Sequence, residues 1–201
     1  MTDAAAPGIA RFRLILWILV AVAAVAATAV FLLRPPSGPL AVTGTPFVLQ
    51  STAGGTFTEQ DLVGKPSLVF FGYTHCPDVC PTTLAETVAW KEQLGISDDA
   101  LRTIFVTVDP ERDTLPVLKD YLGSFDPDVI GLVGDTQQTE AAKASFGVMS
   151  EKGEPDADGF YLVNHSANVL LIDRNGRFQS TIAYGEAADT AVAKIKRLMG
   201  G

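Results

Sequence analysis

A short apolar run followed at once by two closely spaced cysteines most constrains how this chain can fold. The stretch runs from Ser67 to Pro81, and its apolar part, residues 68–71, predicts a strand buried on both faces. Gly72 ends that strand, and the turn after it holds Cys76 and Cys80, the two cysteines of the chain. Two such thiols can form a disulfide, a redox dithiol or a pair of metal ligands.

Length and charge narrow the classes of function. The chain has 201 residues, which suits one domain with appendages and a sizeable core. Its formal net charge is −8, which argues against nucleic acid as a partner and permits metal cations. Two cysteines are too few for a disulfide-stabilised scaffold, so they are expected to form one site.

An uncharged apolar segment near the N-terminus predicts a transmembrane helix. Residues 14–33 carry no charge, and twenty residues are enough to cross a bilayer core of about 30 Å. The apolar run continues through residues 30–33, which favours an uncleaved anchor over a cleaved signal peptide. Arg11 and Arg13 precede the segment and Arg34 follows it, which places the N-terminus in the cytoplasm.

These features predict four parts in the chain. Residues 1–13 form a cytoplasmic lead, 14–33 an anchor, 34–45 a Pro-rich linker and 46–201 a folded domain on the far side of the membrane. The lead lacks the Arg- and Ser-rich composition of a transit peptide, which favours a bacterial inner membrane and a domain facing the periplasm.

Strands and helices alternate along the folded domain. Strands are expected at 47–50, near Phe57, and at 68–71, 103–108, 129–133, 160–163, 168–172 and 178–184. A helical turn is expected after Thr58, a polar loop at 151–159, and helices at 81–94, 114–125, 136–146 and 187–199. This order predicts an α/β fold around a mixed sheet, of thioredoxin-like architecture, with the cysteines between a strand and a helix.

The spacing of the cysteines bears on their chemistry. Three residues separate Cys76 from Cys80, whereas a redox Cys-x-x-Cys motif has two. Pro81 is expected to open the helix, so the helix N-terminus should lower the pKa of the Cys80 thiol. Two thiolates select Cu(I) or zinc over hard cations, but a complete site needs a further ligand from elsewhere in the chain.

Two histidines are candidates for that ligand. His75 adjoins Cys76, and neighbouring side chains on an extended segment point apart, which favours a solvated residue or one that supports a ligand. His165 lies 85 residues beyond Cys80, near the strands expected to approach the dithiol. A lone histidine is more typical of a structural residue than of a ligand, so residue patterns alone leave His165 open.

Three stretches together resemble the signature motifs of the Sco/SenC family. They are Gly72-Tyr-Thr-His-Cys-Pro-Asp-Val-Cys-Pro81, Val108-Asp-Pro-Glu-Arg-Asp-Thr114 and Tyr161-Leu-Val-Asn-His-Ser-Ala167, in the family's order. The similarity extends from about Pro46 to the end of the chain. It implies a membrane-tethered, thioredoxin-like copper protein that assists assembly of the CuA centre of cytochrome c oxidase.

The resemblance also implies particular residues and partners. Cys76, Cys80 and His165 would bind copper as Cu(I), or as Cu(II) with an added weak ligand. Asp109 would act near the copper, although as a residue ahead of Pro110 it is equally expected as a helix cap. The implied partners are the oxidase subunit that carries the CuA site and a further copper chaperone.

Other positions in these motifs carry weaker expectations. Arg112 is expected to form an ion pair within its loop, and Asp113 is expected to cap the following helix. The family usually has Asp before the histidine where this chain has Asn164, which makes a supporting carboxylate role at that position doubtful.

Three functions follow from these residues. The leading hypothesis is a copper metallochaperone. A thiol–disulfide oxidoreductase that reduces the CuA-site cysteines, with Cys76 and Cys80 as its redox pair, is the alternative, and the three-residue spacing counts against it. A thiol peroxidase needs an arginine beside its thiolate, and none flanks this turn in the sequence.

Overall fold

The computed structural model describes residues 7–32 and 44–200, and the chain divides into two units, Met1–Ser37 and Gly38–Gly201. In the first unit, helix α1 (Pro7–Leu32) includes most of the predicted anchor. Its described side chains are largely exposed and apolar, from Phe12 to Val25. Across residues 7–32 and 44–200, no helix is both long enough and apolar enough to span a membrane. The predicted linker lies outside the described residues, except for residues 44 and 45.

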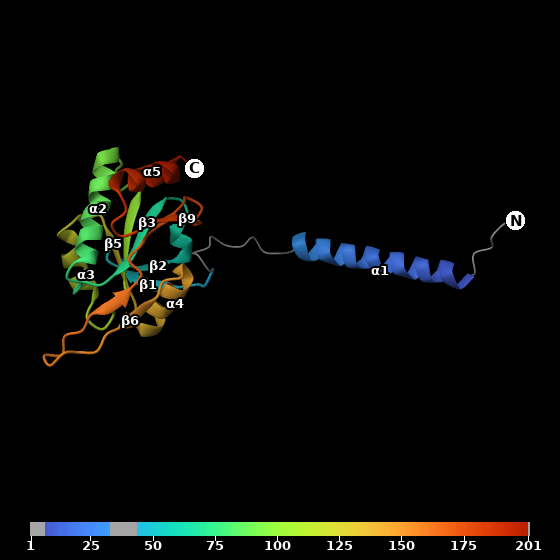
Figure 1. Ribbon diagram of the computed structural model, residues 1–201, viewed down its shortest axis with the longest axis horizontal. Coiled ribbons are helices and arrows are strands. Elements are labelled where there is room, and N and C mark those ends of the chain that lie inside the picture. The colour runs from blue at the N-terminus through green and yellow to red at the C-terminus, as the bar shows by residue number, and fades with distance from the viewer. Residues whose placement is uncertain (1–6, 33–43, 201) are drawn as a thin grey trace. The chain divides into compact units, whose positions relative to one another are not determined.

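Within residues 44–200 the second unit is built on a seven-stranded mixed sheet. Its strands lie in the order β2-β1-β5-β4-β3-β8-β9. They are β1 (Val48–Ser51), β2 (Thr56–Thr58), β3 (Ser67–Gly72), β4 (Arg102–Thr107), β5 (Ile130–Val133), β8 (Val169–Ile172) and β9 (Phe178–Ile182). The central strands β3, β4 and β5 are parallel, and the outer pairings are antiparallel. The predicted α/β class is therefore confirmed (Figure 1).

Strand β3 lies in the interior of this sheet, and all six of its residues are buried. Alternation along the strand sends Phe70 and Phe71 to opposite faces. The ring of Phe70 packs against Phe105 of β4, whereas the ring of Phe71 packs against Phe146, with ring centroids 5.8 Å and 5.4 Å apart. A strand buried on both faces needs apolar residues at every position, which explains the uninterrupted run in the sequence.

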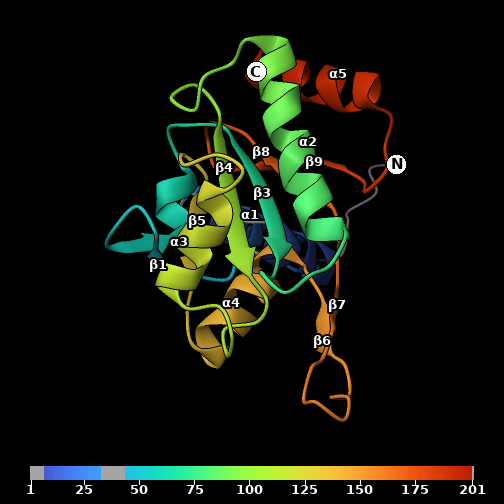
Figure 2. The ribbon, with the colours of Figure 1, turned by 90° about the vertical axis from the view of Figure 1, so that its left-hand side faces the viewer.

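Helices cover both faces of the sheet. Helix α3 (Leu115–Gly123) lies on the Phe105 face, because its Tyr121 packs on that ring. Helix α2 (Val79–Leu94) shares this face and lies beside α5 (Ala188–Met199), as Figure 2 shows. Helix α4 (Thr136–Phe146) contributes Phe146 to the other face. A 3₁₀ turn, η1 (Glu59–Leu62), follows Thr58 as predicted.

Three predicted details of the elements are wrong. Helix α2 begins at Val79 after Asp78, so Pro81 occupies its third position and not its first. Thr114 is the residue that caps α3, because Asp113 is fully buried and turned toward other partners. The predicted polar loop at 151–159 begins as a strand, β6 (Ser150–Lys152), because residues 150–152 pair with β7 (Val163–His165).

Candidate metal centre

The sulfur side of the site is built on the end of β3 and the start of α2. Gly72 closes the strand, and a Cβ added there would lie 2.9 Å from Cys80 Sγ and from the Phe105 ring. Glycine is therefore required because the Cys80 sulfur packs directly on the backbone. The amide of Cys80 at the helix N-terminus lies 3.4 Å from Cys76 Sγ and donates to it. The turn thus points both sulfurs to one side.

Burial decides the ionisation of the Cys80 thiol. Cys80 is 0% exposed, and this burial raises its pKa above the ordinary value. The predicted lowering of this pKa by the helix N-terminus is therefore wrong, because the cost of burying a thiolate outweighs the favourable amide environment. A bound metal cation would compensate for the thiolate charge, so this sulfur is better suited to ligation than to free redox attack.

His165 approaches the sulfurs from strand β7. Its Nε2 atom lies 3.5 Å from Cys80 Sγ, and its Nδ1 atom lies 3.0 Å from the carbonyl oxygen of Ser166. A carbonyl oxygen can only accept, so Nδ1 carries the proton and the Nε2 lone pair faces the thiol. Burial lowers the pKa of His165, which favours this neutral, metal-binding form.

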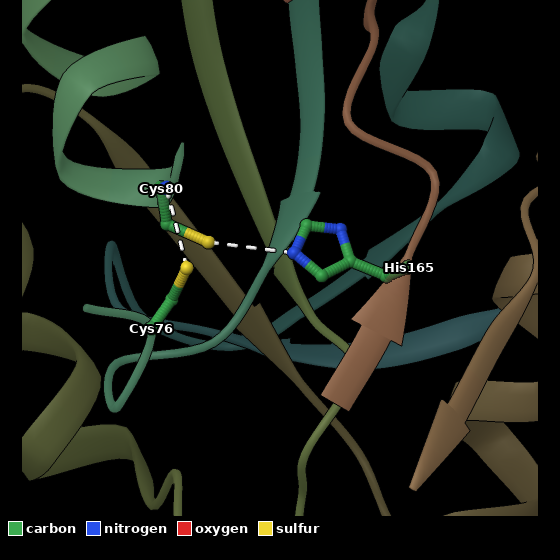
Figure 3. Close-up of side chains that lie close together, drawn as sticks. All are labelled: Cys76, Cys80 and His165. Carbon is green, nitrogen blue, oxygen red and sulfur yellow. Dashed lines mark hydrogen bonds between the residues drawn. The ribbon is translucent and has the colours of Figure 1, made fainter. Parts of the chain in front are cut away.

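Three ligand atoms therefore converge on one point (Figure 3). The Cys76 and Cys80 sulfurs and a His165 nitrogen all lie within 4.8 Å of one another. Cys80 is buried, whereas Cys76 and His165 are partly exposed, so the cluster opens toward solvent on one side. Two soft thiolates and one imidazole fit Cu(I), which accepts three ligands, and leave a position free for a further one.

Asp109 lies outside this group of ligand atoms. It is 4% exposed, its Oδ1 atom accepts a hydrogen bond of 2.9 Å from Tyr161 OH, and its other oxygen pairs with Arg112. The helix-cap interpretation is wrong, because the cap of α3 is Thr114. The predicted ion pair of Arg112 is formed with Asp109.

Asp113 is a residue of the site that sequence reasoning missed. Its carboxylate accepts from the Thr74 amide at 3.1 Å, from the Thr74 hydroxyl at 2.6 Å and from the Thr107 hydroxyl at 2.6 Å. These bonds fix the backbone of the cysteine turn to the end of β4. Two threonines at strand ends opposite a motif aspartate were the signal available in the sequence.

The neighbouring candidates are not part of the ligand group. His75 Nδ1 contacts the Thr74 hydroxyl at 3.0 Å, and its side chain is exposed to the extent expected of a solvated residue. Asn164 is exposed, because alternation along β7 turns it away from the face that carries His165.

A second group of possible ligands lies at the far end of α2. Asp98, Asp126 and Asp128 also bring three oxygens within 4.8 Å of one another. The ammonium group of Lys91, whose side chain is 4% exposed, pairs with both Asp98 and Asp126. This lysine already supplies the positive charge, so the group is an ion-pair network.

A thioredoxin-like domain with a Cys, Cys, His cluster is a recognisable class of protein, and sequence comparison defines it further. The sequence model of the SCO1/SenC family matches residues 36–200, so the chain belongs to that family, as its three motifs predicted. The SCO2-like protein of Rickettsia felis is 38% identical over 157 residues, which cover 73% of this chain and 77% of that protein.

Saccharomyces cerevisiae SCO2, a mitochondrial protein, is 36% identical over 155 residues, which cover 76% of this chain. The chain spans about half the length of that yeast relative, because the matched region covers 52% of it.

Solved structures share the fold. The copper-bound structure of Bradyrhizobium japonicum ScoI is 44% identical with a TM-score of 0.69, and the match covers 76% of this chain and 97% of that one. Yeast Sco1 with copper bound is 34% identical with a TM-score of 0.69, covering 78% of this chain and 87% of that one. The thioredoxin-like α/β fold is therefore confirmed.

Proposed function

We propose that this protein is a copper metallochaperone of the Sco family that binds one copper ion through Cys76, Cys80 and His165. The observation that carries the proposal is the convergence of those three ligand atoms within 4.8 Å. The donor set suits copper, because two thiolates select soft cations over hard ones and three ligands are enough for Cu(I), whereas a structural zinc site takes four. The solved structures of Bradyrhizobium japonicum ScoI and yeast Sco1 have copper bound.

Copper is the cargo of this site, and the differing exposure of the ligands suits delivery. Cys80 is fully buried, whereas Cys76 and His165 are partly exposed. A thiolate from a recipient protein can therefore approach the free position on the exposed side before any resident ligand leaves. Because each incoming ligand binds before a resident one leaves, protein ligands hold the ion at every step, and copper is not released to water.

The recipient is the cytochrome c oxidase subunit that carries the CuA site, and a further copper chaperone loads the protein. Family membership supports this assignment, and the acidity of the chain, with net charge −8, disfavours nucleic acid as a partner.

Residues 14–33 anchor the protein in a bacterial inner membrane, with residues 1–13 in the cytoplasm, 34–45 as the linker and the domain from residue 46 in the periplasm. The uncharged run from residue 14 to 33 and the exposed apolar side chains of α1 support the anchor. The arginines that precede the run support the orientation.

Anaerobic copper titration of the full chain tests the proposed function. We expect one Cu(I) per chain and, with Cu(II), thiolate-to-copper absorption that is lost in Cys76→Ala and Cys80→Ala. The His165→Ala variant should bind Cu(I) more weakly and show a shifted Cu(II) spectrum. Failure of the wild-type chain to bind Cu(I), or unchanged affinity in His165→Ala, would exclude this site.

A thiol–disulfide oxidoreductase is the second candidate, because the Cys80 amide lies 3.4 Å from Cys76 Sγ and the two thiols are free. In this reaction the thiolate of Cys76 attacks a disulfide in the oxidase subunit, and Cys80 then resolves the mixed disulfide. The subunit is reduced to two thiols and the pair is oxidised to a disulfide. A reduction potential of the pair above that of the CuA-site disulfide would exclude this activity.

A further inference from the structure

The strand that carries His165 lies outside the main sheet. Strand β7 pairs only with β6 among residues 44–200, and these two strands form a separate two-stranded sheet, the β6–β7 ribbon. The ribbon and its connecting loop extend away from the seven-stranded sheet in Figure 2. A two-stranded ribbon is marginally stable by itself. Other contacts must therefore hold His165 against the sulfurs.

Arg112 makes the most extensive of these contacts. Its Nε atom donates to the Asp109 carboxylate, and its Nη1 atom donates to the carbonyl oxygen of Tyr161 at 3.1 Å. Its Cζ atom lies 3.6 Å from the centroid of the Tyr161 ring. The side chain is 18% exposed, so these contacts are largely shielded from water. One guanidinium thus joins the turn after β4 to the chain just before β7.

Asp109 and Tyr161 complete the arrangement. The Tyr161 hydroxyl donates to Asp109 at 2.9 Å, so the tyrosine is bound to the same turn through both its backbone and its side chain. Asp109, Arg112 and Tyr161 together are here called the Arg112 cluster. Each member contacts the other two, which fixes the position of Tyr161 relative to the end of β4.

The cluster connects to the imidazole through Tyr73. The Arg112 Cζ atom lies 5.7 Å from the Tyr73 ring centroid, and the Tyr73 hydroxyl accepts from the Val163 amide at 3.2 Å. The Tyr73 ring meets the His165 ring edge to face, with centroids 5.8 Å apart. Tyr73 lies between Gly72 and the cysteine turn, so these contacts join the ribbon to the sulfur side of the site.

We propose that Arg112 is a positioning residue that holds the β6–β7 ribbon, and with it the imidazole of His165, in place for the metal. The inference rests on the proposed function, since it assigns Arg112 a role in binding the same copper ion. Arginine suits the task because its planar fork can pair with a carboxylate, donate to a carbonyl and stack on a ring at once. Lysine offers a single charged group and cannot do all three.

Copper affinity in two backgrounds tests the proposal. Cu(I) affinity is measured by competition with a chromophoric chelator for Arg112→Met alone and combined with His165→Ala. We expect about a ten-fold loss from Arg112→Met in the otherwise wild-type chain, as for other residues that orient a ligand. The same change should reduce Cu(I) affinity less than about two-fold in the His165→Ala background, because that variant has no imidazole for Arg112 to position.

The outcomes separate the two proposals. An equal loss from Arg112→Met in both backgrounds, or no loss in either, would overturn the role of Arg112. Unchanged affinity in His165→Ala alone would overturn the proposed function itself, and with it the metal-binding role of Arg112. Arg177→Met, which changes an exposed arginine just before β9, is the matched control and should change affinity less than about two-fold.

Hydrogen exchange of the metal-free protein gives a readout that does not depend on copper. In Arg112→Met the amides of residues 161–166 should exchange about five-fold faster than in the wild type, while those of β3 and β8 stay unchanged. In Arg112→Lys the amides of residues 161–166 should exchange at a rate between those of the wild type and Arg112→Met. Unchanged exchange at residues 161–166 would overturn the proposal.

A variant with a smaller change guards against general unfolding. If Arg112→Met also accelerates exchange in β3, Tyr161→Phe replaces it, since this change removes only the hydroxyl's bonds to Asp109 and Glu111 and keeps the ring. We then expect a smaller acceleration confined to residues 161–166, and acceleration across the whole sheet would overturn the proposal.

Discussion

Cys80 reaches the metal centre from the core of the domain, whereas His165 reaches it from a ribbon outside the main sheet. Cys80 is fully buried, lies in the first turn of α2 and packs its sulfur on the backbone of β3. His165 lies on the β6–β7 ribbon and is held by ring contacts and, as we propose, by the Arg112 cluster. The sulfur side is fixed by core packing, and the imidazole side by a few side chains.

This difference bears on how copper is kept and released. Moving Cys80 would require repacking of Phe105 and α2, which costs free energy across the whole core. Moving His165 requires only that the ribbon shift, with the seven-stranded sheet intact. We therefore infer that the imidazole is the ligand that yields during transfer, while the sulfurs retain the ion until the recipient binds it.

Loss of a sulfur should have the largest effect on copper binding. Cys80→Ser should weaken Cu(I) affinity by roughly a hundred- to a thousand-fold, because one soft ligand contributes about 3–4 kcal/mol in sites of this kind. Chelator competition measures the change, with Thr82→Ala, at an exposed position in α2, as the control. A loss of under ten-fold would contradict the view that the sulfur side retains the ion.

Loss of the imidazole should have a smaller effect. His165→Ala leaves both thiolates, which can hold Cu(I) in a two-coordinate arrangement, so we expect an affinity loss of roughly ten- to a hundred-fold. His75→Ala, which removes a partly exposed histidine outside the ligand group, is the matched control. If His165→Ala lowered Cu(I) affinity as much as Cys80→Ser, the imidazole and sulfur sides would contribute equally to binding. That result would contradict the proposed difference between them.

A methyl group at Gly72 should disturb the sulfur side selectively. Gly72→Ala places a Cβ 2.9 Å from Cys80 Sγ and the Phe105 ring, and such overpacking costs about 1–3 kcal/mol of unfolding free energy. Urea denaturation measures this loss of unfolding free energy. Gly123→Ala in α3 is the control, because nothing lies within 4 Å of its added Cβ, and it should be neutral or slightly stabilising. Equal stability of both variants would contradict close packing at Cys80.

The pH dependence of stability should show the smallest effect, on the imidazole side. Burial lowers the pKa of His165 in the folded metal-free protein, so the unfolded chain binds a proton first as the pH falls. Stability from this group is complete above about pH 6.5 and is lost as the pH falls from there toward the lowered pKa. Urea denaturation from pH 7.5 to 5.5 should show a steeper loss in wild type than in His165→Ala. Parallel curves would contradict the burial of the imidazole.

Much of the fold could be predicted from local pattern. The buried run of β3, the bounds of α4 and the 3₁₀ turn after Thr58 each depend on neighbouring residues, so the sequence indicated them. The start of α2 was misplaced because the amide of Cys80 bonds to the Cys76 sulfur, a contact that extends the helix before Pro81. Asp113 was misassigned because its partners, Thr74 and Thr107, are brought to it only by the sheet.

The sequence by itself determined the kinds of ligand and the elements that carry them, because strand, turn and helix signals act over a few residues. Family motifs identified His165, but its 3.5 Å approach to Cys80 depends on the pairing of distant strands. Only the tertiary structure decided that burial raises the pKa of the Cys80 thiol and that Arg112 binds the chain before β7. Burial and long-range contact depend on how all the elements pack together, which no local pattern contains.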